Sequence, residues 1–151
     1  MTQNNKELLL KDLCARLHYG VKVRYSTYEG FITCTLLSIN PTYNTVDLWS
    51  KIACFNSVSI HKIKPYLFPM SSMTEEQIDE LKDLCDMYDP VNYNDAYEEW
   101  GIRLITKHFM DDGYHFKFNF QLFEFLNKNR LDYCGLIEKE LAIDATNLNI
   151  Y

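Results

Sequence analysis

The sequence has no closely spaced pair of cysteines, although the 151-residue chain contains five. Their number is odd and no C-x-x-C pair occurs, so the pattern fits neither a secreted disulfide framework nor a zinc cluster. The widely spaced positions are Cys14, Cys34, Cys54, Cys85 and Cys134. We therefore expect reduced thiols and a cytoplasmic protein.

Other patterns that support catalysis are also missing. The four histidines form no H-x-x-x-H or H-E-x-x-H pair, and the five glycines form no phosphate-binding loop. Asp111 and Asp112 stand beside Gly113, which indicates a turn rather than a catalytic carboxylate pair. We predict no enzymatic activity, no metal site and no cofactor. An enzyme with a dispersed site is the weaker alternative.

Long hydrophobic runs are absent as well. No apolar run approaches the roughly 18 residues needed to span a bilayer, and residues 1–6 are too polar for a signal peptide. Apolar residues make up 47% of the chain and charged residues 24%, which is typical of a globular protein. No membrane partner is expected.

Charge is unevenly distributed along the chain. Residues 1–70 carry a net charge of +4 and residues 71–151 a net charge of −10. Such an asymmetry can indicate a half that binds a polyanion. The simpler interpretation is that the acidic half docks on the basic half within one molecule.

Residues 1–70 have the pattern of one helix followed by short strands. Apolar spacing predicts a helix over residues 6–17, and Gly20 suits its left-handed end. The expected buried stripe of this helix is Leu10, Leu13, Cys14 and Leu17. Strands are predicted over residues 21–25, 31–40, 45–49, 52–55 and 58–64, with Pro65 ending the last.

The alternation within these strands predicts which faces are buried. Val21, Val23 and Tyr25 should face inward, opposite the basic Lys22 and Arg24. Residues 31–40 are apolar on both faces in their middle, which predicts a strand covered on both sides. Short antiparallel strands with tight turns favour an SH3-like or Sm-like barrel, capped at one end by the preceding helix.

Residues 71–151 are expected to be mainly helical and to pack on the barrel. Thr74 and Gln77 form a capping box at the start of a helix. The expected buried stripe of this helix is Ile78, Leu81, Cys85 and Tyr88, and Asp89–Pro90 should end it. The fold class is thus α+β, with domains over residues 1–70 and 71–151 or one composite domain.

The rest of this half is harder to assign. Asn94 could cap a helix within residues 91–113. The alternating Phe116, Phe118 and Phe120 predict a short strand, and residues 122–126 return to helical spacing. A last helix or helical turn is expected over residues 136–142, followed by a tail.

A basic face on the barrel is the candidate binding site. It would gather five cations from the predicted strands and turns, with Tyr25, Tyr28, Tyr43 and Trp49 nearby. The five cations are Lys22, Arg24, Lys51, Lys62 and Lys64. Small barrels bind single-stranded nucleic acid by stacking bases on aromatic rings in a positive groove. A solvated outer face explains the same lysines, and the pI near 5 is far below that of most nucleic-acid-binding domains.

Three stretches resemble a known family. They are KDLCARLHYGVKV (residues 11–23), IKPYLFPMSSMTEE (63–76) and FLNKNRLDYCGLI (125–137), about a quarter of the chain. The chain is similar to a family of small proteins without an assigned activity, found in anaerobic gut bacteria and their phages. It departs from the family pattern at His18, where proline is usual, and at Cys134, where arginine is usual. A role that depends on that arginine therefore does not carry over.

These observations favour a binding protein over an enzyme. The resemblance implies a phage or mobile-element accessory protein, a class that often acts by binding host proteins. The leading hypothesis is a non-catalytic cytoplasmic protein that binds another protein, such as a host factor. The alternative is a small-barrel module that binds nucleic acid, which the acidic balance of the chain makes less favourable.

Overall fold

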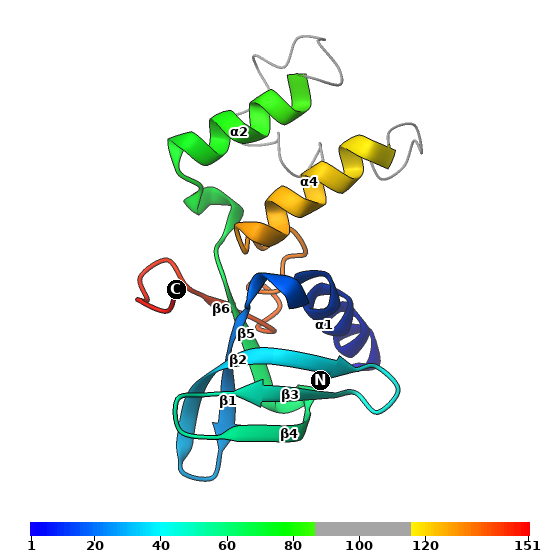
Figure 1. Ribbon diagram of the computed structural model, residues 1–151, viewed down its shortest axis with the longest axis vertical. Helices are drawn as coiled ribbons and strands as arrows, with labels where there is room; N and C mark the ends of the chain where they lie inside the picture. The colour runs from blue at the N-terminus through cyan, green and yellow to red at the C-terminus, as the bar shows by residue number, and fades with distance from the viewer. Residues whose placement is uncertain (87–115) are drawn as a thin grey trace.

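The computed structural model describes residues 1–86 and 116–151 (Figure 1). It is an α+β structure in which α1 (Gln3–Arg16) lies against a six-stranded sheet. Two further helices, α2 (Glu75–Asp86) and α4 (Phe116–Lys128), lie at the opposite end of the molecule. Short 3-10 helices connect the elements, over Leu17–Tyr19 (η1), Ile60–Lys62 (η2) and Met70–Ser72 (η3).

The sheet is open rather than closed into a barrel. Its strands are β1 (Lys22–Thr27), β2 (Gly30–Asn40), β3 (Thr45–Trp49), β4 (Cys54–Ser59), β5 (Ile63–Leu67) and β6 (Ile143–Asp144). They are ordered β4-β3-β2-β1-β5-β6, and only β5 and β6 run parallel. β4 and β6 are the edges, so β4 does not pair with β5 and the expected closed barrel is not shown.

The hydrophobic core lies between the inner face of the sheet and α1. Val21 and Val23 are buried and Tyr25 packs against the core, as their alternation predicted. The C-terminal segment completes this core with Leu136 and Leu141. The predicted division into residues 1–70 and 71–151 stays a prediction, with part of the second half contributing to the core of the first.

The buried stripe of α1 differs from the predicted one. The helix begins three residues earlier than predicted, because the Thr2 hydroxyl accepts the backbone N–H of Asn5. Its buried residues are Leu9, Asp12, Leu13 and Arg16, whereas Cys14 is exposed. The prediction was wrong for Cys14 because an ion pair between Asp12 and Arg16 lets two charged residues occupy the buried face.

The long strand β2 is covered on one face only. Cys34 and Leu36 are buried on the inner face, but Phe31 and Leu37 are exposed. The register with β3 shifts between Leu36 and Ser38, which marks a β-bulge. The expectation that this strand is buried on both sides is therefore wrong.

The last strands of the sheet also differ from their predicted bounds. β4 ends before η2, and β5 continues through Pro65, which lies opposite Val23 of β1. β6 pairs only with Tyr66 and Leu67, so β5 has a neighbour on one side only at Pro65. A strand tolerates a proline in that situation, because the missing N–H costs no ladder hydrogen bond on the free side.

The capping box of α2 is confirmed. The Thr74 N–H donates to Gln77 Oε1 at 3.0 Å, and the Gln77 N–H donates to Thr74 Oγ1 at 3.2 Å. Leu81 is buried in a second cluster with Leu122 and Leu126 of α4. Tyr88, the helix end at 89–90 and the interpretation of residues 91–113, with Asn94, Asp111 and Asp112, lie outside the described residues.

Residues 116–120 belong to α4, so the short strand predicted from alternating phenylalanines is wrong. Leu122, Phe125 and Leu126 are spaced as one buried face of α4. The helix continues from this face toward its N-terminus and includes the alternating phenylalanines. Of the predicted helix or helical turn over residues 136–142, the structure shows turns over residues 136–140. The expected tail contains β6, which joins the sheet beside β5.

Candidate binding face

The structure brings three of the five predicted basic residues onto one face of the sheet. Lys22 and Arg24 lie in β1 on the face opposite Val23, and Lys64 of β5 stands directly across from Arg24. Lys62 lies in η2 and Lys51 in the turn between β3 and β4, where both are exposed. Lys51 and Lys62 therefore flank this face rather than belong to it.

The register of β1, β2 and β3 identifies the other residues of the same face. Thr35 of β2 lies opposite both Lys22 and Trp49, and Thr33 lies opposite Arg24. We call this surface the outer face, and it comprises Lys22, Arg24, Phe31, Thr33, Thr35, Trp49 and Lys64. The core occupies the inner face, so this surface is the exposed side of the sheet.

Direct contacts hold two cations of the outer face, Lys22 and Arg24, in place. Lys22 Nζ donates a hydrogen bond to Thr35 Oγ1 at 2.8 Å. The Arg24 guanidinium lies over the Phe31 ring, 4.4 Å from its centroid. Such a cation–π contact holds the guanidinium plane against the ring and leaves its edge free for a ligand.

Large apolar side chains are exposed on and beside the outer face. Phe31 is 66% exposed and Trp49 46% exposed, and both belong to the face. Leu37 in the bulge of β2 is 53% exposed, and Ile52 in the turn after Trp49 is 81% exposed. Single exposed apolar residues are common, but several on neighbouring strands are typical of an interaction surface.

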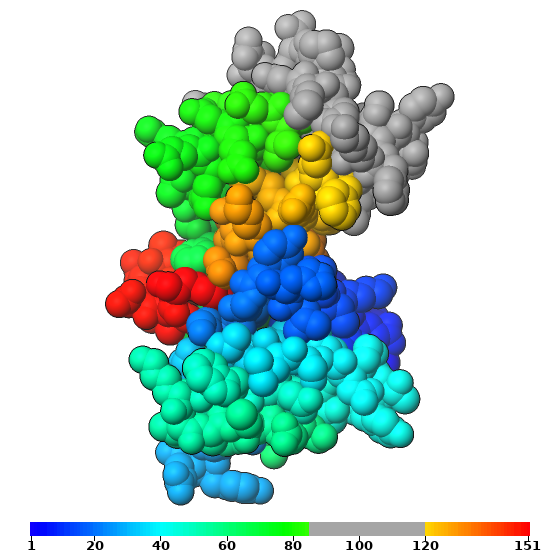
Figure 2. All heavy atoms as spheres, in the orientation of Figure 1, coloured from blue at the N-terminus to red at the C-terminus, as the bar shows by residue number. Residues whose placement is uncertain are grey.

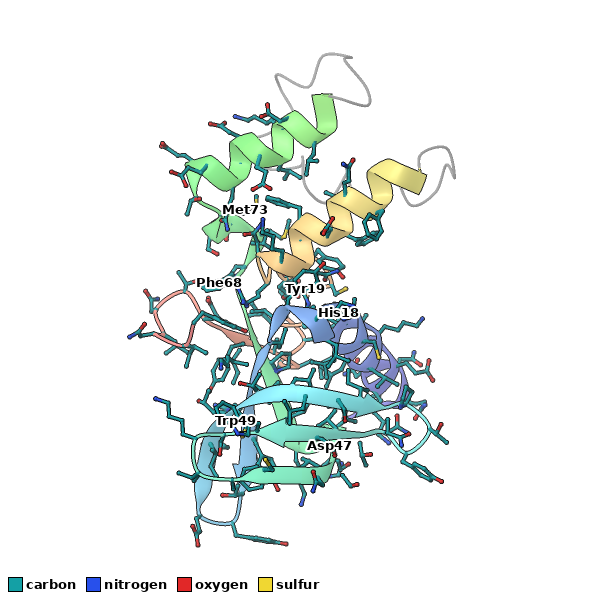
Figure 3. The ribbon with its side chains drawn as sticks, in the orientation of Figure 1. His18, Tyr19, Asp47, Trp49, Phe68 and Met73 are labelled. Carbon is teal, nitrogen blue, oxygen red and sulfur yellow. The ribbon has the colours of Figure 1, made fainter. Side chains whose placement is uncertain are left out.

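Within strands β1 to β5, Asp47 is the single acidic residue. Asp47 lies two positions before Trp49 on β3, and Figure 3 labels both residues in the sheet. Its carboxylate accepts hydrogen bonds from the Ser38 hydroxyl and the Ser57 N–H. The Ser38 bond and then the Ser57 bond lower the pKa of Asp47, so this carboxylate is ionised but already occupied.

The tyrosines predicted beside the basic residues are placed elsewhere. Tyr25 lies on the inner face and packs edge-on against Phe55, with ring centroids 5.1 Å apart. Tyr28 is fully exposed in the β1–β2 turn, where the Lys62 ammonium is 6.0 Å from its ring centroid. Tyr43 lies in the β2–β3 turn and is also exposed. Only Trp49 of the four predicted aromatics belongs to the outer face.

The acidic helix does not cover the basic residues. α2 carries the exposed acids Glu75, Glu76, Asp79, Glu80 and Asp83. It lies at the opposite end of the molecule from the sheet, as the space-filling view in Figure 2 shows. The ion pairs Asp12–Arg16 and Asp79–Lys82 each lie within one helix. Among the described residues, α2 therefore does not dock onto the basic strands, and docking of the whole acidic half stays a prediction.

A second polar cluster is buried between α1 and the segment after α4. Arg16 donates to both carboxylate oxygens of Asp12, at 2.8 and 2.9 Å, and to the Leu131 carbonyl at 2.8 Å. The guanidinium also lies 4.9 Å from the centroid of the Tyr133 ring. Burial alone would lower the pKa of Arg16, but the Asp12 carboxylate raises it, so the guanidinium stays charged.

This cluster does not activate a nucleophile. Cys134 is the thiol beside it, and burial, together with the Asp12 carboxylate, raises the pKa of Cys134 to about 11. Burial likewise raises the pKa of Tyr133 to about 12. Reactive cysteines have a lowered pKa, so this thiol is not activated. The hydrogen bond from Arg16 to the Leu131 carbonyl instead joins α1 to the segment after α4.

The sequence does contain patterns that could have identified the residues that the predictions missed. Thr33 and Thr35 alternate with Ile32, Cys34 and Leu36, which indicates a strand with one polar face. That alternation would have placed Phe31 on the exposed side. Asp12 and Arg16 are spaced four residues apart between buried leucines, which is the spacing of a helical ion pair.

Other classes of site find no support in the described part of the chain. Within residues 1–86 and 116–151, no group of three or more histidine, cysteine and acidic side chains is arranged to hold a metal ion. No helix in these ranges is long and apolar enough to cross a bilayer. Comparisons with family models, curated proteins and solved structures found no match to the chain. The resemblance noted from the three sequence stretches therefore stays a prediction.

Proposed function

We propose that this protein is a non-catalytic accessory protein that binds another protein through its outer face. The observation that carries the proposal is the exposure of Phe31 and Trp49 on a sheet face that also holds Arg24. Aromatic residues and arginine dominate the energetics of protein–protein interfaces. The exposed Leu37 and Ile52 extend the apolar area and suit contact with side chains of a partner.

We further propose that the sheet is a variant of the SH3-like or Sm-like barrel. A helix before β1, the order β4-β3-β2-β1-β5 and a 3-10 turn before β5 support this proposal. In this chain β6 pairs with the outer edge of β5 at Tyr66 and Leu67, so β4 cannot pair with that part of β5 to close a barrel. Such barrels serve many functions, so the fold by itself does not choose a partner.

The origin of the partner is proposed from the family resemblance. A phage or mobile-element protein of this family would act in the cytoplasm on a host factor. Reduced cysteines are usual in the cytoplasm, and Cys14, Cys34, Cys54 and Cys134 are free thiols in this structure. No cofactor enters the proposal.

Single-stranded nucleic acid is the second candidate ligand. It is favoured by the placement of Lys22, Arg24 and Lys64 on the same sheet face as Trp49, far from the acidic α2. Charges more than about 8 Å apart are largely screened at physiological ionic strength, so the net charge of −6 does not repel a polyanion at the outer face. The exposed aliphatic residues, however, match a protein partner better than a nucleic acid.

Affinity capture with matched variants tests the proposal. The tagged protein is incubated with lysate of an anaerobic gut bacterium, with and without nuclease, beside a Phe31→Ser/Trp49→Ser variant. The control is Phe120→Ser, because Phe120 is exposed on α4, away from the sheet. Circular dichroism and thermal melts confirm that all three proteins are folded.

The proposal predicts a protein that is retained by the wild type and by Phe120→Ser, is lost from the double variant and resists nuclease. Equal retention by the double variant would place the binding surface elsewhere. Loss of all captured material on nuclease treatment would favour the second candidate.

A further inference from the structure

Two cations stand directly across from each other on the outer face. Arg24 of β1 and Lys64 of β5 are register partners in an antiparallel pair, so their side chains emerge side by side from neighbouring strands. Lys22 lies two residues from Arg24 on the same face. Like charges in directly opposed positions destabilise a sheet. The arrangement therefore works against the stability of the free protein.

No acidic side chain in the described part of the chain pairs with these two cations, although Arg24 makes a favourable contact with the Phe31 ring. Among residues 1–86 and 116–151, the Arg24 and Lys64 side chains have no hydrogen bond or ion pair. The carboxylate of Asp47 lies on β3, two strands from β1, and accepts hydrogen bonds from Ser38 and Ser57. The charge of this half-buried cation pair thus has no ionic partner among the described residues.

We propose that Arg24 and Lys64 bind carboxylates of an acidic segment of the protein partner, an inference that rests on the proposed function. The Phe31 ring fixes the plane of the Arg24 guanidinium, and a fixed guanidinium can donate two parallel hydrogen bonds to one carboxylate. Lys64 supplies a point charge for a second carboxylate one strand away. Phe31 would contact an apolar residue next to these acids, and Trp49 of β3, which lies across from Thr35, would contact a residue farther along the same segment.

Carboxylates fit this surface better than the phosphates of a nucleic acid. Single-stranded nucleic acid is bound by stacking successive bases on exposed aromatic rings. One face of the Phe31 ring is already occupied by Arg24, and Tyr28 lies off the face in a turn. Trp49 alone remains as an unobstructed stacking platform of the outer face. The exposed Leu37 and Ile52 beside it favour a protein segment.

Synthetic probes test this assignment without knowledge of the partner. The first probe is a fluorescent 12-residue peptide in which glutamates flank a leucine. The others are the same peptide with glutamine for glutamate and a 12-nucleotide oligothymidylate. Fluorescence anisotropy is measured at low and moderate salt with the wild type and with Arg24→Gln/Lys64→Gln. The matched control is Lys11→Gln/Lys128→Gln, which removes two exposed cations from α1 and α4.

The assignment predicts that the glutamate peptide binds at least about tenfold tighter than the glutamine peptide, and more weakly as salt rises. The Arg24→Gln/Lys64→Gln variant should lose this preference, and the control variant should keep it. Equal binding of the glutamate peptide to both double variants would overturn the assignment. So would an oligothymidylate that binds more tightly than the peptide and depends on the same two cations.

The stability of the free protein provides a second readout. Lys64→Glu replaces the opposed cations with an ion pair, so its melting temperature should rise by roughly 1–4 °C while peptide binding is lost. Lys11→Glu should leave the melting temperature and the binding unchanged. A fall in the melting temperature of Lys64→Glu would contradict the inferred repulsion.

Two further results separate this inference from the proposed function. If the captured partner needs Phe31 and Trp49 but not Arg24 and Lys64, the proposed function stands and the acidic segment is excluded. Salt-sensitive self-association of the wild type, abolished by Lys64→Glu, would identify the acidic α2 of a second copy as the occupant. That result would overturn the assignment to a separate partner.

Discussion

Asp12 and Arg16 stand one turn apart on α1 and form a two-armed ion pair whose side chains are completely shielded from water. The same guanidinium donates to the Leu131 carbonyl, in the segment that follows α4. The pair therefore joins the N-terminal helix to a part of the chain more than a hundred residues away. Both residues lie within residues 11–23, one of the three stretches on which the resemblance was based, and here they have a structural role.

Removal of one member of this pair should destabilise the fold strongly. Arg16→Leu leaves the Asp12 carboxylate buried without its partner, and such a loss costs about 3–5 kcal/mol. Urea unfolding measures the change, with Lys11→Leu as the control on the exposed side of α1. The double variant Asp12→Leu/Arg16→Met should be more stable than Arg16→Leu, because no charge is then left buried. A loss below about 1 kcal/mol for Arg16→Leu would show that water reaches the pair.

The raised pKa of Cys134 predicts a loss of stability at alkaline pH. In the folded protein this pKa is about 11, above the ordinary value of 9.0, because burial disfavours the thiolate. The unfolded chain therefore releases the thiol proton first, and the contribution of Cys134 to stability is lost as the pH rises from 9 to 11. The free energy of unfolding of the wild type should fall more steeply over this range than that of Cys134→Ala. Parallel pH profiles of the two proteins would show that the thiol is not desolvated.

The capping box of α2 predicts a local effect of Thr74. Thr74→Ala removes the hydroxyl that accepts the Gln77 N–H, and such a loss costs about 1 kcal/mol. Denaturant melts measure the change, and Ser71→Ala is the control because Ser71 is an exposed hydroxyl residue just before the cap. A cost for Thr74→Ala that does not exceed that of Ser71→Ala would mean that α2 is held by its packing on α4 and not by its cap.

Local patterns predicted part of this fold well. Thr45–Trp49 is a strand with the predicted bounds, and Gly20 has the left-handed φ of 63° expected at a helix end. The Thr74–Gln77 box was also correct. Each of these features depends on residues within one turn or one strand, so sequence spacing contains the necessary information.

Features that depend on distant partners could not be predicted in the same way. Pro65 ended the predicted strand, but pairing with Val23 continues β5 beyond it. Ile143 lies in a strand only because Tyr66 offers a free edge. Phe120 belongs to a helix because its neighbours pack on α2, which alternation alone does not show.

The sequence predicted which cations belong to the candidate face, but not how the other residues of the face are arranged around them. The sequence suggested that Lys22, Arg24 and Lys64 lie together, and the register of β1 and β5 places them on one face. It did not show that Phe31 is exposed beneath Arg24. That fact depends on which side of β2 the core occupies, and α1 and the C-terminal segment decide it.

Site-specific photo-crosslinking from the outer face tests the central claim most directly. A benzophenone amino acid replaces Trp49 in one protein and Phe120 in another, since both side chains are exposed but only Trp49 lies on the sheet. Each protein is irradiated in lysate, treated with nuclease and examined by mass spectrometry. We predict a covalent adduct with another protein from position 49 and none from position 120. Adducts of the same protein from both positions, or only nuclease-sensitive adducts from position 49, would contradict the claim that the outer face binds a protein.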